Sequence, residues 1–256
     1  VNWDGEKQQL HITELPPLPM PLDNLSATYA DGCLYVAGGK GKPQTVPIGK
    51  DGSQTAPTNP FFSLQLTPSL QKEWVRLPDF PGPARVQPVL TAQQSEDGIR
   101  LYLAGGFQPA SAHQEAIVCT DMLSYHPKTK QWRNEGFLPS LAGGSHRTVT
   151  GGCAIASGDS SILLVGGVNY DRFRDALNHP EPDYLLHPAD WYKFNTSLLQ
   201  YNTFTKHWTH LGNYEELARA GAGIANNANT VIIIGGELKP GIRTPEVNAF
   251  KLTCHP

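Results

Sequence analysis

The sequence predicts an all-β fold, and three observations support this class. An apolar, β-rich run that ends in Gly-Gly occurs four times along the 256 residues. A strand-like segment with an aromatic residue, and then a tryptophan, follows each of the first three runs. Glycine (25) and proline (22) are both abundant, which favours many short strands and tight turns over long helices. Together these features indicate several sheets of similar construction.

The repeated run gives the architecture. Its copies are 34–39, 101–106, 162–167 and 231–236, and their first glycines lie about 60 to 70 residues apart. A single four-stranded sheet cannot bury both of its faces, so repeated sheets stack radially around an axis. Gly-Gly after the second strand and tryptophan in the fourth strand are typical of a kelch-type β-propeller. We therefore expect about four blades in this chain.

Each element of the repeat has a physical reason. Small residues such as those of 220–225 suit the innermost strand, where space is narrowest. Gly-Gly ends a buried strand and lets the chain turn with positive φ or approach another backbone closely. The tryptophans Trp74, Trp132 and Trp208 are expected to pack between neighbouring sheets. The repeats exceed the kelch period of about 50 residues, which predicts insertions near 40–59 and 169–194.

The two ends of the sequence carry strands without an obvious blade. Residues 1–3 are expected to be the end of one strand, Asp4-Gly5 a turn, and residues near 10–15 an outer strand. The fourth repeat stops after a third strand near 247–252. We expect one propeller domain over 1–256 that is incomplete as a ring. In the alternative, the N-terminal strand pairs with the last blade and closes the ring.

Composition excludes several function classes. The net charge is −3 and no basic run occurs, so a nucleic-acid partner is not expected. No apolar stretch approaches the roughly 20 residues of a membrane span. The four cysteines form no CxxC pair, and Cys33, Cys119 and Cys153 are expected to be buried thiols. Phosphate-loop, dinucleotide, HExxH and GxSxG motifs are absent, and we expect neither a metal nor another cofactor.

One segment resembles a known family. Residues 235–244, Gly-Gly-Glu-Leu-Lys-Pro-Gly-Ile-Arg-Thr, are similar to the Gly-Glu-x-Lys-Pro-Gly-x-Arg-Thr segment of the bacterial sialic acid mutarotases, or N-acetylneuraminate epimerases. Further similar segments are 15–21, 80–85 and 166–169, the last followed by a long insertion. The resemblance runs from Leu15 to about Phe250. Because that family has six blades, it implies a circularly permuted relative whose other two blades lie on another chain or segment.

The resemblance also implies a function. A mutarotase interconverts the α and β anomers of N-acetylneuraminate by acid/base opening and closure of the sugar ring, without a cofactor. This implies an isomerase of carbohydrate metabolism that acts on a small sugar acid, in a bacterial periplasm or secreted. The absence of a visible signal peptide does not decide the compartment, because a mature secreted chain lacks one too.

The candidate site follows from the charged segment. Glu237, Lys239 and Arg243 share one loop after a buried strand, and loops at blade ends line the mouth of a propeller. Arginine binds a carboxylate through its planar fork, and a glutamate can transfer the proton of the anomeric hydroxyl. The predicted catalytic residues are Glu237 and Arg243. The predicted substrate-binding residues are Arg85, Asn169, Lys239, His146 and Arg147.

Structural interpretations of the same residues stay open at this point. Glu237 and Arg243 also suit an ion pair that holds the loop, and Arg85 and Asn169 suit turns. His146 also suits a structural histidine whose ring is hydrogen-bonded within the fold. Aromatic residues of the second insertion suit stacking on a sugar or packing of the insertion onto the propeller. These are Tyr170, Tyr184, Trp191 and Tyr192.

Two other functions compete with the mutarotase. A non-catalytic kelch module that binds a protein or glycan uses the same fold, so fold alone does not decide between them. The charged triplet Glu237, Lys239 and Arg243 favours the enzyme, because a binding module does not need it facing the channel. A copper oxidase needs a Tyr/His set with a reactive cysteine, which nothing in the sequence specifies.

Overall fold

The computed structural model describes residues 2–41, 59–67, 69–141, 143–227 and 229–252. The expected insertion near 40–59 and the fourth cysteine, Cys254, therefore lie largely or wholly outside the described residues. The described part is built of antiparallel strands, with the α-helix α1 (Tyr170–Asn178) and three short 3₁₀ helices.

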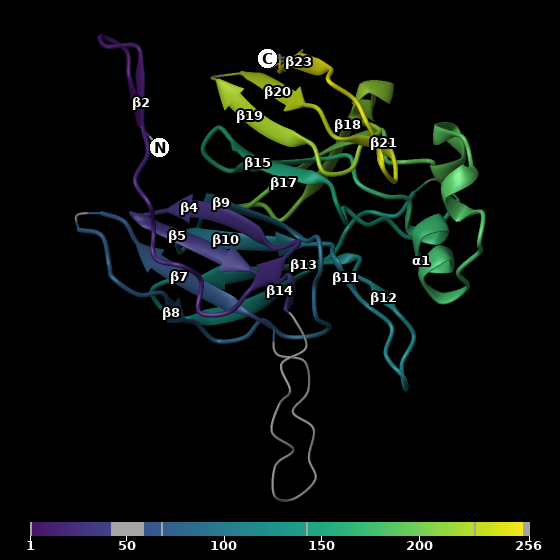
Figure 1. Cartoon of the computed structure of the whole chain (residues 1–256), viewed down its shortest axis with the longest axis horizontal. Coiled ribbons are helices and arrows are strands. Elements are labelled where there is room, and N and C mark those ends of the chain that lie inside the picture. The colour runs from purple at the N-terminus through teal and green to yellow at the C-terminus, as the bar shows by residue number, and fades with distance from the viewer. Residues whose placement is uncertain (1, 42–58, 68, 142, 228, 253–256) are drawn as a thin grey trace, which may run out of the picture.

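Four sheets follow one another along the chain as the blades of a β-propeller (Figure 1). Blade 1 contains β4 (Ser26–Ala30), β5 (Cys33–Ala37), β7 (Phe61–Gln65) and β8 (Val75–Arg76). Blade 2 contains β9 (Val89–Ser95), β10 (Gly98–Ala104), β13 (Asp121–His126) and β14 (Gln131–Phe137). Blade 3 contains β15 (Cys153–Ser157), β16 (Ser161–Val165), β17 (Ser197–Asn202) and β18 (Trp208–Asn213). Blade 4, as far as it is described, contains β19 (Gly223–Asn227), β20 (Thr230–Ile234) and β23 (Val247–Lys251). The predicted all-β propeller with about four blades is confirmed.

The remaining elements are small hairpins and turns between the blade strands. The paired strands are β1 (Asn2–Asp4) with β2 (Gln9–His11), β3 (Leu22–Asp23) with β6 (Lys40–Gly41), β11 (Phe107–Gln108) with β12 (Ile117–Val118), and β21 (Glu237–Lys239) with β22 (Ile242–Arg243). The 3₁₀ helices are η1 (Tyr184–Leu186), η2 (Ala189–Tyr192) and η3 (Glu215–Leu217). The expected insertion 169–194 thus contains α1, η1 and η2.

The Gly-Gly strands β5, β10, β16 and β20 are each second in their blade, as the repeat predicts. Where these strands end, both physical requirements for glycine are met: a positive φ and the close approach of another backbone segment. Gly38 has φ +71°, and a Cβ there would lie 2.4 Å from the Arg85 carbonyl oxygen. Gly166 has φ +66°, and a Cβ there would lie 2.6 Å from the Arg219 carbonyl oxygen. Any side chain at these positions would push successive blades apart.

The first strand of each blade is the innermost, because β4, β9, β15 and β19 contact one another in that order. Aromatic and aliphatic side chains fill the space between neighbouring sheets. The Trp132 ring centroid lies 5.0 Å from that of Phe61 in blade 1, and Trp208 of blade 3 packs against a cluster that includes Tyr102 and Met122 of blade 2. The predicted packing of tryptophan between sheets is therefore observed at these two positions.

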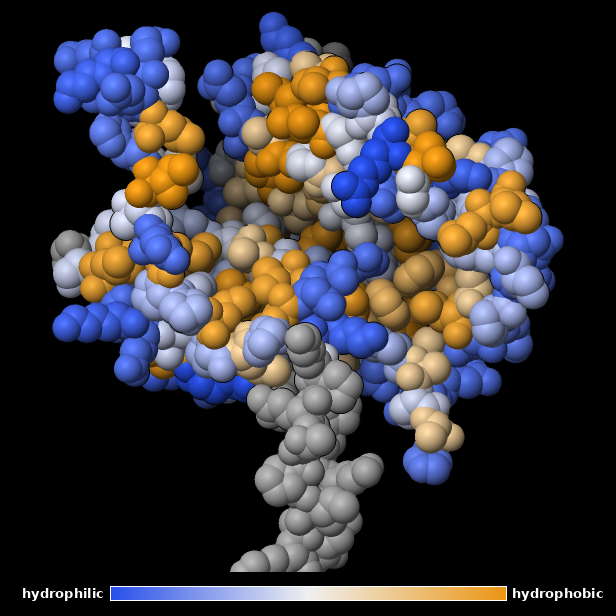
Figure 2. All heavy atoms as spheres, viewed as in Figure 1, coloured by the Kyte–Doolittle hydropathy of each residue, from blue (hydrophilic) through white to orange (hydrophobic). Residues whose placement is uncertain are grey.

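Blade 4 presents apolar side chains to solvent. Ile234 is 47% exposed and Val247 is 61% exposed, and Figure 2 shows apolar surface over this sheet. Within the described residues, β23 pairs only with β20, and β1 and β2 pair only with each other. The N-terminal strand is thus not seen to close the ring through the last blade, which was the alternative expected from the sequence.

Candidate functional site

The predicted catalytic residues face each other across one short hairpin. Glu237 on β21 is paired in register with Arg243 on β22. The turn between them includes Gly241, whose φ is +78°, and this left-handed conformation lets the chain fold back between the two strands. The Arg243 Nε lies 3.4 Å from the Glu237 Oε1. The structure therefore brings the two side chains together.

The hairpin is anchored next to the innermost strand of blade 4. The Glu237 amide donates to the Ala220 carbonyl at 2.7 Å, and the Ala220 amide donates to the Glu237 carbonyl at 3.0 Å. Ala220 lies three residues before β19, the strand nearest the propeller axis. The backbone thus fixes Glu237 at the axial end of the blade, where loops of a propeller meet ligands.

The two side chains differ in exposure. The Glu237 side chain is 30% exposed, whereas that of Arg243 is 82% exposed. An exposed ion pair contributes about 0–1 kcal/mol to stability, so this pair is a minor factor in holding a hairpin that its backbone already anchors. The Arg243 guanidinium remains accessible to an anion, with a partly sheltered carboxylate beside it.

Lys239 ties the hairpin to the second insertion. Its Nζ donates to the carbonyl oxygens of Leu185 at 3.1 Å and His187 at 2.6 Å. These carbonyls belong to the turn of η1 and the residue that follows it. The ammonium group is therefore used in positioning the hairpin against the insertion, and it also adds positive potential beside Glu237. This tie was not evident from the sequence.

The aromatic residues of the insertion pack mainly against one another. Tyr192 is 2% exposed in a cluster with Val168 and Phe194, and the ring centroids of Tyr184 and Trp191 lie 5.9 Å apart. The Tyr192 hydroxyl donates to the Tyr184 carbonyl oxygen. Packing of the insertion, rather than an open stacking surface, thus accounts for these three aromatic residues.

Asn169 begins the insertion, and His146, which precedes blade 3 in the sequence, contacts its first helix. Asn169 is the N-cap of α1, and its Oδ1 accepts from the Arg172 amide at 3.1 Å. The imidazole of His146 is exposed and lies edge-on to Tyr170, with ring centroids 5.1 Å apart.

A cavity of about 740 Å³ beside the insertion is lined by Asn169, Asn195 and Leu238, among others. Glu237, Lys239 and Arg243 are not among its lining residues.

Arg85 is buried away from solvent. Its side chain is 0% exposed, and its Nη2 donates to both carboxylate oxygens of Asp121 at 2.9 and 2.8 Å. Its Nη1 donates to the Gly105 carbonyl at 2.9 Å. The structure thus gives Arg85 an ion pair inside blade 2 and does not place it beside the hairpin pair.

Arg147 is also buried, at 7% exposure, but its surroundings differ. Its Nε donates to the Pro139 carbonyl oxygen at 3.0 Å. It lines a second cavity, of about 380 Å³, together with Leu199 and Trp208 of the outer half of blade 3. Glu237 and Arg243 are not among the residues that line this second cavity.

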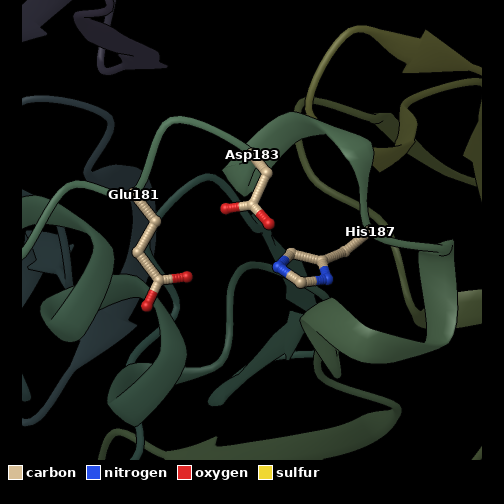
Figure 3. Close-up of side chains that lie close together, drawn as sticks. All are labelled: Glu181, Asp183 and His187. Carbon is tan, nitrogen blue, oxygen red and sulfur yellow. The ribbon is translucent and has the colours of Figure 1, made fainter.

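Three possible metal-ligand side chains converge within the insertion (Figure 3). Single donor atoms of Glu181, Asp183 and His187 all lie within 4.8 Å of one another. Both carboxylates are exposed, and exposed carboxylates commonly gather without an ion. Proximity alone does not make this cluster a metal centre, and the chemistry at the hairpin does not use it.

No helix in the described ranges is long and apolar enough to cross a membrane.

Fold and site together define a β-propeller with a carboxylate and a guanidinium on a hairpin at the axial end of one blade. A family model described as N-acetylneuraminate epimerase matches residues 15–255, and the chain belongs to this family.

Relatives with the same description are 27–30% identical. The N-acetylneuraminate epimerase of Haemophilus influenzae (strain PittEE) is 30% identical over 243 residues, which are 89% of this chain and 60% of that protein. The epimerase of Salmonella paratyphi B is 27% identical over 248 residues, which are 91% of this chain and 57% of that protein. The chain therefore spans little more than half of that relative.

A solved structure gives independent support for the fold. The structure titled YjhT matches with a TM-score of 0.69 and 24% identity, over 93% of this chain and 67% of that one. At this level of identity the likeness establishes the propeller fold.

Proposed function

We propose that the protein containing this chain is a mutarotase that interconverts the α and β anomers of N-acetylneuraminate. One observation carries the proposal: Glu237 and Arg243 lie 3.4 Å apart at the axial end of blade 4, in the segment that resembles the epimerase signature. The relatives that share this family are named N-acetylneuraminate epimerase. The substrate class is thus a small sugar acid.

Arg243 is assigned to the substrate carboxylate. Its guanidinium is 82% exposed, so an incoming carboxylate can reach it without displacing a buried partner. A guanidinium binds a carboxylate through two parallel hydrogen bonds, which also fix the orientation of the sugar. Lys239 adds positive potential nearby, and this offsets repulsion between the substrate and Glu237.

Glu237 is assigned to proton transfer at the anomeric centre. Ring opening removes the proton of the anomeric hydroxyl, breaks the bond from the anomeric carbon to the ring oxygen, and protonates that oxygen. Reclosure on the other face of the carbonyl gives the other anomer. One group must act as base and another, or a water, as acid, and Glu237 is suited to either role. The chemistry requires no metal or organic cofactor.

Three of the other predicted residues are assigned supporting roles. Arg85 and Asn169 stabilise blade 2 and the start of α1, and Lys239 holds the insertion against the hairpin. We further infer that other blades, on another segment or chain, cover the apolar face of blade 4 that includes Ile234 and Val247. A periplasmic or secreted location is part of the proposal, and cell fractionation tests it.

Two substitutions separate the assigned roles. Arg243→Ala should mainly weaken binding of N-acetylneuraminate in calorimetric titrations, about tenfold or more. Glu237→Gln should keep the shape of the site and mainly slow turnover, by roughly 10²–10⁴-fold. Glu96→Gln, an exposed carboxylate between β9 and β10, is the matched control. Binding without turnover in the unmodified protein would instead identify a glycan-binding module.

A further inference from the structure

Blades 2 and 4 each contain a buried arginine paired with an acid at the same place. Arg85 pairs with Asp121 in blade 2, and the Arg219 Nη2 donates to the Glu246 Oε2 at 2.7 Å in blade 4. Arg219 is 3% exposed. Both acids stand at the beginning of the third strand, where their carbonyl oxygens accept from the first glycine of Gly-Gly. The pair therefore occurs in blades 2 and 4, whereas in blade 1 the carbonyl that accepts from the first glycine, Gly38, belongs to Pro60.

Blade 3 lacks both members of this pair. The Gly151 amide donates to the Gln87 carbonyl, and the Gly221 amide donates to the Gly151 carbonyl, so these three positions correspond. Counting back two residues puts Val149 in the place of the two arginines. Ser197 begins the third strand of blade 3 and takes the place of the acid.

Arg147 brings a guanidinium into blade 3, two residues before Val149. It is 7% exposed, and its Nη1 is buried without a hydrogen-bond partner in the part of the chain that the structure describes. No carboxylate of those residues forms an ion pair with it. Burial lowers the pKa of Arg147, as desolvation does for a cation. A buried guanidinium without a counter-charge is costly, and an anion would remove that cost.

A cavity lies beside this guanidinium. Arg147 and Ser197 both line it, and its volume of about 380 Å³ lies within the range of small-molecule sites. Leu199 and the Trp208 indole provide apolar walls. Further polar groups come from Ser140, His210 and Asn213. Of these lining residues, His210 is exposed at the surface.

We infer that this cavity binds a small hydroxylated carboxylic acid. The ligand's carboxylate group pairs with Arg147, in the role that the acids Asp121 and Glu246 have in blades 2 and 4. The polar wall offers hydrogen bonds to hydroxyl groups, and the indole offers a flat face to a carbon chain or ring. Neither Glu237 nor Arg243 lines this cavity. The inference does not depend on the mutarotase reaction.

Thermal unfolding with gluconate and glucuronate as probes tests the inference. A ligand that binds only the folded state raises Tm, by on the order of 5–10 °C at a concentration 100-fold above its dissociation constant. We expect this rise in the unmodified protein and in Arg243→Ala, and its loss in Arg147→Met. The neutral polyol glucitol is the control for non-specific stabilisation. A rise of equal size with inorganic sulfate would overturn the assignment to carboxylates.

Ser197→Asp provides a second variant that does not rely on removing the arginine. It supplies the acid that blades 2 and 4 have, and should raise Tm without ligand while abolishing the response to gluconate. Isothermal titration should show binding of gluconate to the unmodified protein and at least about tenfold weaker binding to both variants. Gluconate responses no larger than those of glucitol, or equal responses in all three proteins, would overturn the inference.

Discussion

Replacing Asp121 with alanine should destabilise the protein much more than removing an exposed carboxylate. The Asp121 carboxylate is 20% exposed and accepts both hydrogen bonds of the Arg85 Nη2. Without it, a guanidinium that is 0% exposed keeps the Gly105 carbonyl as its remaining acceptor. Its Nε is already buried without a partner. The substitution therefore leaves a buried charge without compensation.

The structure sets the size of the effect. Removing one partner of a buried ion pair costs about 3–5 kcal/mol, and the partial exposure of Asp121 favours the lower end. For a chain of this size, 1 kcal/mol corresponds to about 2–4 °C in Tm, so Tm should fall by about 6–12 °C. Urea unfolding followed by circular dichroism gives the free energy of unfolding independently.

Two further variants control this experiment. Asp175→Ala removes a 67% exposed carboxylate of α1 that pairs with His179, the C-cap of the helix, and should change the free energy of unfolding by less than about 1 kcal/mol. Arg85→Met with Asp121→Leu removes both charges and should recover much of the loss. If Asp121→Ala costs no more than Asp175→Ala, Arg85 is not held as an internal ion pair and the reasoning is wrong.

Three other predictions concern stability, local order and reactivity. Burial raises the pKa of Glu135, but hydrogen bonds from two hydroxyls and a guanidinium outweigh it and lower this pKa below the ordinary 4.5. Glu135 should therefore stabilise the fold above about pH 4.5 and lose this effect as the pH falls through its folded-state pKa. Replacing it in Glu135→Gln should make the free energy of unfolding depend less steeply on pH, roughly between pH 3 and 6. A pH dependence as steep as in the unmodified protein would contradict this. Lys239→Met should increase the rate of amide hydrogen exchange in residues 184–192 without lowering the global Tm by more than about 4 °C. Unchanged exchange rates would show that the hydrogen bonds from Lys239 do not hold the insertion in place. Burial raises the pKa of Cys153 to about 11, so its thiol should react with a disulfide reagent at pH 8 only after unfolding, and rapid labelling of the folded protein would contradict its burial.

The fold could be predicted because its signals are local and repeated. Gly38 and Gly166 are required by positive φ and by close contact with the next segment, and both needs appear directly as Gly-Gly in the sequence. The hairpin pair could also be predicted, since Glu237 and Arg243 are close in sequence and a Lys-Pro-Gly turn separates them.

The roles of the buried arginines could not be predicted in the same way. The partner of Arg85 is Asp121, 36 residues later, and nothing local indicates that contact. Arg147 stands in blade 3 two residues before the position that Arg85 has in blade 2, and only the backbone hydrogen bonds between the blades reveal this offset.

The helix α1 had a local signal in the sequence. Asn169 is a good N-cap residue, and Asp171 in the first turn favours the start of a helix.

The central claim is tested most directly by proton NMR of freshly released α-N-acetylneuraminate. The approach to the β anomer should be faster with the complete protein than in matched buffer, and the rate should rise in proportion to protein concentration. In Glu237→Gln, with an unchanged Tm, the added rate should fall by roughly 10²–10⁴-fold. Equilibration no faster than in buffer would contradict the claim that the protein is a mutarotase. A full rate in folded Glu237→Gln would contradict the role given to Glu237.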